Sequence, residues 1–163
     1  PLEEMEHLAC FGAGLLALSA HVDGNQSQLD LAAELCESCY LMYHRQKLGL
    51  GPEKVDIHTM RPTIGNHYYI LRPEVVESIF ILWRLTKEVK YRRWGLEIAQ
   101  SIVKHCQISA TGGFTGIHDI EDASVPKNDR QESFFLAETL KYLYLLYQPD
   151  DVIPLDKWVF NTE

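Results

Sequence analysis

Apolar residues recur along most of the chain at the three- and four-residue spacing of amphipathic helices. In the segment 28–46, Leu31, Leu35, Cys39 and Tyr43 follow one another at intervals of four. Ser27, just before this segment, is a plausible N-cap. Four further helices are predicted over residues 5–20, 73 to about 88, about 91 to 106, and 132–147. The pattern therefore predicts about five helices.

Two long segments without a helical period separate these helices. Residues 47–71, "KLGLGPEKVDIHTMRPTIGNHYYIL", contain Gly, Pro and β-branched residues and predict an irregular or hairpin connection. Residues 107–131 are polar and contain glycine, and the terminal "KWVFNTE" is strand-like. Because long loops in compact domains are usually functional, we expect helical hairpins whose long loops gather at one end.

The first apolar segment has the look of a signal peptide. "HLACFGAGLLALSA" is apolar on nearly every face, but the preceding "PLEEME" is acidic where a signal peptide needs positive charge. The apolar part is also too short to span a bilayer. We expect a buried helix here, and an equally buried one in "ESFFLAETLKYLYLLY". The chain starts with Pro1, so we expect it to be processed or cut from something longer.

Composition indicates one globular domain over residues 1–163. The chain is 46% hydrophobic and 23% charged, with a formal net charge of -8 and no Lys/Arg run. This balance argues against nucleic acid as a partner. "NQS" at Asn25 is an acceptor sequence for N-glycosylation and favours a secretory compartment weakly.

Four cysteines leave the disulfide pattern open: Cys10, Cys36, Cys39 and Cys106. They allow three fully paired connectivities. Cys36 and Cys39 form a CxxC inside a helical pattern. A redox or zinc site there is a weak hypothesis, because no second CxxC or His pair has metal-site spacing.

The stretch "YYILRPEVVESIF" places charged residues inside an apolar run. Pro73 is typical of a first helical residue, and Glu74 and Glu77 follow on one face. Acidic residues in a first turn are favourable against the helix dipole, so both glutamates could be a start signal and nothing more. Alternatively, the helix end presents two carboxylates to a sugar, a metal or a water.

Other candidate site residues lie outside this stretch and form no motif with one another. Glu138 lies in an apolar helix and needs a partner, which could be Lys141 at a solvated edge. Phe134, four residues earlier, would share its face, as suits a sugar site or an ordinary core. His7 is more typical of a core or cap residue, and the terminal "NTE" offers hard oxygen ligands of the kind calcium takes.

Four motifs together resemble one family. "HLACF", "YYILRPEVVES", "SFFLAETLKYLYLLY" and "VFNTE" occur in the order and at the spacings of class I α-1,2-mannosidases, glycoside hydrolase family 47. The resemblance runs from about Glu3 to Glu163 and looks closer to the Golgi members than to the endoplasmic-reticulum enzyme. It implies an all-α fold: about the C-terminal third of an (α/α)7 barrel of helical hairpins, with short β segments in the long loops.

The resemblance also implies roles for individual residues. Glu74 would activate the attacking water, Glu77 and Glu138 would hold waters of a Ca2+ ion, and Thr162 would be its direct ligand, with Glu163 as a further water-mediated contact. The residues matching the mannose site are His7, Arg72, Phe134 and Glu138. Cys10 and Cys39 match the disulfide of the family, which leaves Cys36 and Cys106 unpaired.

The implied activity is hydrolysis of terminal α-1,2-linked mannose from high-mannose N-glycans, with inversion. The general acid of the family would lie upstream of Pro1, as would any membrane anchor, so this chain alone is expected to be inactive. The expected location is the secretory lumen, the Golgi rather than the endoplasmic reticulum. A lectin-like relative that binds mannose glycans in glycoprotein degradation, and a helical protein-interaction module, are the alternatives.

Overall fold

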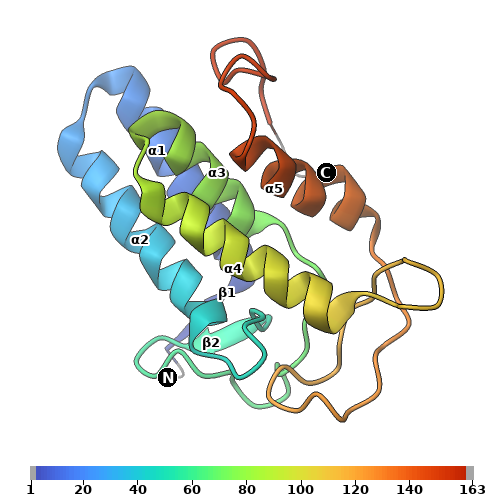
Figure 1. Ribbon diagram of the computed structural model, residues 1–163. Helices are drawn as coiled ribbons and strands as arrows, with labels where there is room; N and C mark the ends of the chain where they lie inside the picture. The colour runs from blue at the N-terminus through green and yellow to red at the C-terminus, as the bar shows by residue number, and fades with distance from the viewer. Residues whose placement is uncertain (1–2, 161–163) are drawn as a thin grey trace.

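A computed structural model of the chain describes residues 3–160 and has a mostly helical fold (Figure 1). The described residues contain five α-helices: α1 (Phe11–Asp23), α2 (Gln26–His44), α3 (Glu74–Thr86), α4 (Val89–Cys106) and α5 (Leu140–Leu146). The shorter elements are β1 (Glu4–Glu6), the 3₁₀ turn η1 (His7–Cys10), β2 (Lys54–Asp56) and the π-helical turn η2 (Phe135–Thr139). The predicted helical fold is thus confirmed.

The helices form two antiparallel hairpins, α1–α2 and α3–α4, with α5 beside the second (Figure 1). Helix α1 packs against α2 and α3, and α3 packs in turn against α4 and α5. Short turns close the hairpins, and each contains a residue with positive φ: Gly24 after α1 and Lys87 after α3. Helix α3 therefore lies at the centre of the helical layer.

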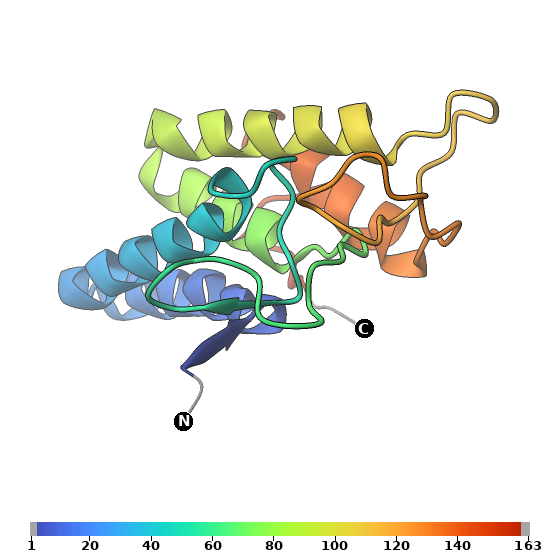
Figure 2. The ribbon, with the colours of Figure 1, turned by 90° about the horizontal axis from the view of Figure 1, so that it is seen from below.

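The two long connections gather at the other end of the hairpins, as predicted (Figure 2). An antiparallel bridge between Tyr69 and Ile117 joins them, and the Ile120 N–H donates to the His67 carbonyl at 2.8 Å. Within the first connection, β2 pairs antiparallel with β1, with Met5 opposite Val55. This end of the molecule is the one where α3 begins.

The predicted start of the first helix was wrong. Residues 4–6 form β1 and His7–Cys10 a 3₁₀ turn, so that α1 begins at Phe11. The cause is tertiary: β1 pairs with β2, and the His7 N–H donates to the Glu53 carbonyl at 2.9 Å.

The predicted N-cap of the second helix was also wrong. Asn25 caps α2, because its side chain accepts the Gln28 N–H at 3.2 Å, and Ser27 lies inside the helix. Helix α1 runs on to Asp23 and ends at the left-handed Gly24.

The strand-like reading of the last segment does not hold in its described part. Residues 157–160 are turn and irregular backbone. Phe160 instead packs its ring against Phe80 and Tyr142, with centroids 5.4 and 5.8 Å apart. Aromatic packing, and not strand pairing, holds this part of the tail to α3 and α5.

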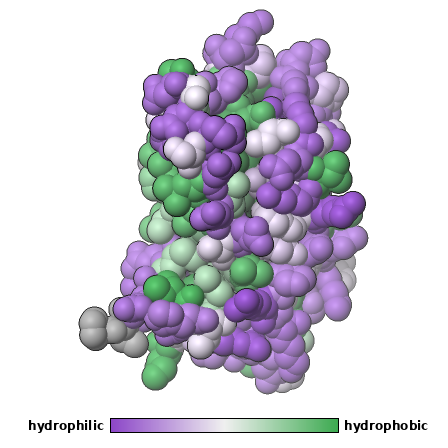
Figure 3. All heavy atoms as spheres, turned by 90° about the vertical axis from the view of Figure 1, so that its left-hand side faces the viewer, coloured by the Kyte–Doolittle hydropathy of each residue, from purple (hydrophilic) through white to green (hydrophobic). Residues whose placement is uncertain are grey.

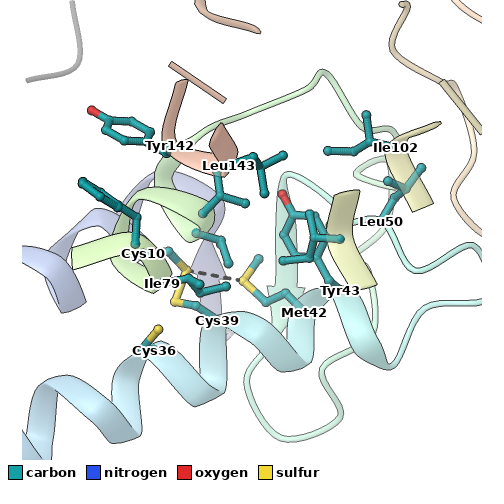
Figure 4. Close-up of a cluster of buried hydrophobic side chains, with 14 of the residues drawn as sticks. Cys10, Cys36, Cys39, Met42, Tyr43, Leu50, Ile79, Ile102, Tyr142 and Leu143 are labelled. Atoms are coloured by element: carbon teal, nitrogen blue, oxygen red, sulfur yellow. Dashed lines mark hydrogen bonds between the residues drawn. A yellow bond between two sulfur atoms is a disulfide. The ribbon is translucent and has the colours of Figure 1, made fainter. Parts of the chain in front are cut away.

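The disulfide between Cys10 and Cys39 is present, with the Cα atoms 5.8 Å apart (Figure 4). It joins the start of α1 to α2 inside the core, where Met42 lies against it. Cys36 and Cys106 are buried free thiols. Since Cys39 bonds to Cys10, the idea of a CxxC redox or zinc site was wrong.

The first and last helices are buried on one face only, which corrects the expectation of deep burial. In α1, Ala13, Gly14 and Ala17 are buried, whereas Phe11 and Leu15 are exposed. The last helical segment likewise exposes Leu136 and Tyr144. The small residues of α1 are inside because α2 and α3 approach its backbone closely there. Figure 3 shows apolar patches among the polar side chains on one side of the molecule.

The close contact of α1 with α3 yields a stability prediction at Gly14. A Cβ at this position would lie 2.8 Å from Ile81 Cδ1 and 3.2 Å from Ser78 Oγ. We expect Gly14→Val to lower the free energy of unfolding by about 1–3 kcal/mol through overpacking. Gly12→Val is the matched control, since its Cβ would find only Leu35 Cδ2, at 3.9 Å. Equal loss in both variants by denaturant titration would contradict this explanation.

Candidate active site

The N-terminal end of α3 holds a buried carboxylate in a hydrogen-bonded chain. Glu74, the first residue of α3, is 3% exposed, and its Oε2 lies 2.8 Å from His7 Nδ1. His7 Nε2 lies 2.7 Å from the hydroxyl of Tyr43 on α2. Three elements, η1, α2 and α3, therefore position Glu74. A purely capping glutamate would point at solvent, so that interpretation was wrong.

The pKa of Glu74 determines which atom carries the proton in its hydrogen bond with His7. Burial raises the pKa of Glu74, but the hydrogen bond and charge of His7, with a smaller contribution from Arg72, lower it more, so the net shift is downward. The carboxylate is thus ionised and can only accept a hydrogen bond. His7 Nδ1 must then carry the proton of this hydrogen bond, and its Nε2 forms a second hydrogen bond with the Tyr43 hydroxyl.

Arg72 lies beside the Glu74 carboxylate, but its closest ion pair is with Glu53. Its Nε lies 2.8 Å from both carboxylate oxygens of Glu53, and its Nη1 lies 3.6 Å from Glu74 Oε1. Glu53 also accepts the His7 N–H through its backbone carbonyl. The first long connection thus supplies a residue that holds both His7 and Arg72 in place.

The backbone just before Arg72 is held in an unusual conformation. Leu71 has φ of 69°, which non-glycine residues adopt only when surrounding contacts enforce it. Thr139 of η2 supplies such a contact, since its hydroxyl donates to the Leu71 carbonyl at 2.6 Å. The π-helical turn and the start of α3 are therefore locked together.

Glu77 and Glu138 form a second group of buried carboxylates, 7% and 4% exposed. Burial, together with the charges of Glu138 and Glu74, raises the pKa of Glu77 to about 7. The Tyr142 hydroxyl donates to Glu77 Oε1 at 3.2 Å. Because Glu138 is buried, its placement at a solvated edge with Lys141 was wrong.

The helix that carries Glu138 is not regular at this point. Residues Phe135–Thr139 form a π-helical turn, in which the Leu140 N–H bonds to the Phe135 carbonyl five residues back. Such turns are rare and often occur at functional sites. Phe134 precedes the turn and is half-buried, so the α-helical spacing from which a shared face with Glu138 was predicted does not apply.

Calcium binding is supported only indirectly. Thr162 and Glu163 lie outside the described residues. Within residues 3–160, no group of three or more His, Cys, Asp or Glu side chains is arranged to hold a metal. One observation does fit a bound cation or its water: Glu77 Oε2 is buried and has no hydrogen-bond partner among the described residues. Carboxylate oxygens are ligands that calcium and its waters accept.

A surface pocket of about 390 Å3 lies elsewhere, between α2 and α4. It shares only Tyr43 with the carboxylate site, and none of Glu74, Glu77 or Glu138 lines it. The chemistry of the buried carboxylates, and not the size of this pocket, identifies the candidate site.

Three functional side chains escaped the sequence analysis: Tyr43, Glu53 and Tyr142. Tyr142 lies in an apolar helical segment, and its bond to Glu77 joins residues 65 positions apart. Tyr43 was assigned to a core stripe and Glu53 to an irregular loop, and neither pattern carries information on a partner. These contacts come from tertiary packing alone.

Comparisons with known proteins show the family of the chain. Residues 2–163 match the sequence profile of Glycosyl hydrolase family 47. The chain is 47% identical, over 99% of its length, to human mannosyl-oligosaccharide 1,2-alpha-mannosidase IB, and covers 26% of that protein. It is 41% identical, over 98% of its length, to the rat endoplasmic reticulum mannosyl-oligosaccharide 1,2-alpha-mannosidase, covering 26% of it.

A solved structure supports the same relationship. An α-1,2-mannosidase from Trichoderma reesei superposes with a TM-score of 0.79 at 30% identity, over 90% of this chain and 34% of that one. The chain thus spans about a quarter of the length of the curated relatives. No helix among the described residues is long and apolar enough to cross a membrane. The profile match over residues 2–163, the identities and the shared fold show that this chain belongs to glycosyl hydrolase family 47.

Proposed function

We propose that the protein containing this chain hydrolyses terminal α-1,2-linked mannose from high-mannose N-glycans, with inversion and with calcium. The observation that carries the proposal is the buried, ionised carboxylate of Glu74 at the start of α3. His7 orients it through a hydrogen bond of 2.8 Å between Nδ1 and Oε2. The names of the family relatives support the reaction and its substrate.

In this mechanism Glu74 is the general base. An inverting glycosidase uses one carboxylate to take a proton from water and an acid to protonate the leaving oxygen. The lowered pKa keeps Glu74 ionised at neutral pH, and the Tyr43–His7 chain fixes its orientation. We place the general acid in a part of the family domain that this chain, which covers 26% of the human relative, does not include.

The metal in this proposal is Ca2+. Thr162 would be its direct ligand, and Glu77, Glu138 and Glu163 would hold its waters. When bound, calcium orients the attacking water and the mannose hydroxyls. The buried oxygen of Glu77 that has no partner among the described residues supports this arrangement.

The sugar is held by His7, Arg72, Phe134 and Glu138. Arg72 is fixed by Glu53 and keeps its Nη1 near Glu74, which suits a guanidinium that donates to sugar hydroxyls beside the base. The half-buried Phe134 provides an apolar ring for the C–H face of mannose.

The fold and location follow the family. We propose that the two hairpins and α5 are part of an (α/α)7 barrel. The Cys10–Cys39 bond supports an oxidising compartment, the secretory lumen. Within it we favour the Golgi, because "YYILRPEV" and "LACF" resemble the Golgi members of the family more than the endoplasmic-reticulum enzyme.

The test is mannose release from a high-mannose N-glycan by the complete protein. We expect release of α-1,2-linked residues and none from an α-1,6-linked control, with loss of activity on chelation and recovery with Ca2+. Glycan binding without release would favour the lectin-like relative, and neither binding nor release would favour a helical interaction module.

A pH prediction follows from the contact of His7 with Glu74. Replacing His7 by Leu removes the hydrogen bond that lowers the pKa of Glu74, while burial continues to raise it. A base works only when ionised, so the acidic limb of kcat/KM should move to higher pH. His7→Asn, whose amide can still donate to Glu74, should move it less. Identical pH profiles for wild type and His7→Leu would contradict the assigned contact.

A further inference from the structure

The short turn between α1 and α2 is exposed throughout. All residues from 21 to 27 are exposed, and Val22 is 83% exposed. This turn lies at the end of the hairpins opposite the two long connections (Figures 1 and 2). Since α1 has 13 residues at about 1.5 Å each, the turn is about 20 Å from the start of α1. It is therefore remote from Glu74.

The turn contains the single Asn-x-Ser/Thr triplet of the sequence, Asn25-Gln26-Ser27. The Ser27 hydroxyl donates to Asn25 Oδ1 at 2.8 Å, and the Gln28 N–H donates to the same oxygen at 3.2 Å. Among the described residues, the hydrogen bonds of Asn25 use its N–H, its carbonyl and Oδ1, and none uses Nδ2. The cap of α2 therefore occupies the oxygen of this exposed residue and makes no use of the nitrogen.

We propose that Asn25 carries an N-linked glycan. Asn-x-Ser/Thr is the acceptor triplet in secreted proteins. The Cys10–Cys39 bond indicates that the chain folds where this modification takes place. Attachment at Nδ2 leaves Oδ1 free to accept the Gln28 N–H, so the glycan and the helix cap are compatible. The glycan also marks this turn as solvent-facing in the complete protein.

The transfer uses a polyprenyl-diphosphate-linked oligosaccharide of the host as co-reactant. A bond forms between Asn25 Nδ2 and C1 of the first sugar, and the bond from C1 to the diphosphate oxygen breaks. The lipid diphosphate leaves with that electron pair, and Nδ2 loses one proton to the transferase. No oxidation or reduction takes place.

The test is peptide mapping by mass spectrometry of the complete protein, secreted from eukaryotic cells. Enzymatic release of an N-glycan converts the carrier Asn to Asp, which marks the site. We expect the modification at position 25 in wild type and in Ser27→Thr, and its loss in Ser27→Ala and Asn25→Asp. In Asn25→Asp, where position 25 is already Asp, the loss is read as a mass of the glycosidase-untreated protein that lacks the glycan. Ser38→Ala on the same helix is the control and should keep the glycan.

Ser27→Ala and Asn25→Asp both remove the acceptor triplet but keep the helix cap, so loss of the glycan in them is not a consequence of misfolding. Ser27→Ala retains the Asn25 cap, and Asn25→Asp retains a side chain that caps equally well. Formation of the Cys10–Cys39 bond, read from the same digest, verifies passage through the oxidising lumen. Unmodified Asn25 in wild-type protein with this disulfide formed would overturn the proposal, as would a modification that persists in Ser27→Ala. Neither outcome depends on mannosidase activity.

Discussion

Replacing Glu74 by Gln in the complete protein should lower turnover by about 10²–10⁴-fold, the usual value of general-base assistance. The amide has the shape of the carboxylate, and its oxygen can still accept the hydrogen bond from His7 Nδ1. It cannot take a proton from water. Glycan binding should therefore survive, and the loss should fall on kcat.

The matched control is Glu37→Gln, the same change on the exposed face of α2. It should leave kcat and KM unchanged. Wild-type turnover in Glu74→Gln would contradict the assignment of the base, and so would an equal loss in both variants. A rise in KM with unchanged kcat would instead make Glu74 a binding residue.

Removing the disulfide should produce a large loss of stability. The bond joins Cys10 to Cys39, 29 residues apart, and a loop of that size corresponds to about 3–4 kcal/mol in the chain-entropy account. The double variant Cys10→Ala/Cys39→Ala should lose that much unfolding free energy in a denaturant titration. The bonded cysteines also hold η1 against α2, so His7 should lose part of its fixed position.

The Cys36→Ala variant distinguishes the stability lost with the disulfide from the stability lost when a buried cysteine side chain is shortened. Cys36 is also fully buried on α2 but forms no disulfide, so its loss should cost clearly less. A reductant should destabilise wild type and Cys36→Ala, and leave the double variant unchanged. If reductant has no effect on wild type, the bond does not contribute as described.

Local patterns were sufficient for the helices but not for their ends. The four-residue spacing of Leu31, Leu35, Cys39 and Tyr43 predicted α2 correctly. It could not show that residues 4–6 leave the first helix to pair with β2, because the partner strand is some 50 residues away. Nor could apolar composition show that Phe11 and Leu15 face outward, since the exposed face depends on which helices pack nearby.

The candidate site could be predicted only in part, because motifs indicate its carboxylates but not the residues that contact them. Motif resemblance pointed to Glu74, Glu77 and Glu138, and the structure finds all three buried. The residues that support them come from other elements through tertiary contacts: Tyr43 bonds to His7, Glu53 to Arg72, and Tyr142 to Glu77. The π-helical turn at Phe135–Thr139 contacts α3 and has no sequence periodicity of its own.

The central claim is that Glu74 activates a water that displaces mannose with inversion. Proton NMR of the complete protein acting on an α-1,2-linked mannobiose, recorded before mutarotation, reports the anomer formed first. Inversion at an α-linkage predicts β-mannose as the first product. The appearance of α-mannose first would mean a covalent intermediate and a nucleophilic carboxylate, and would contradict the account.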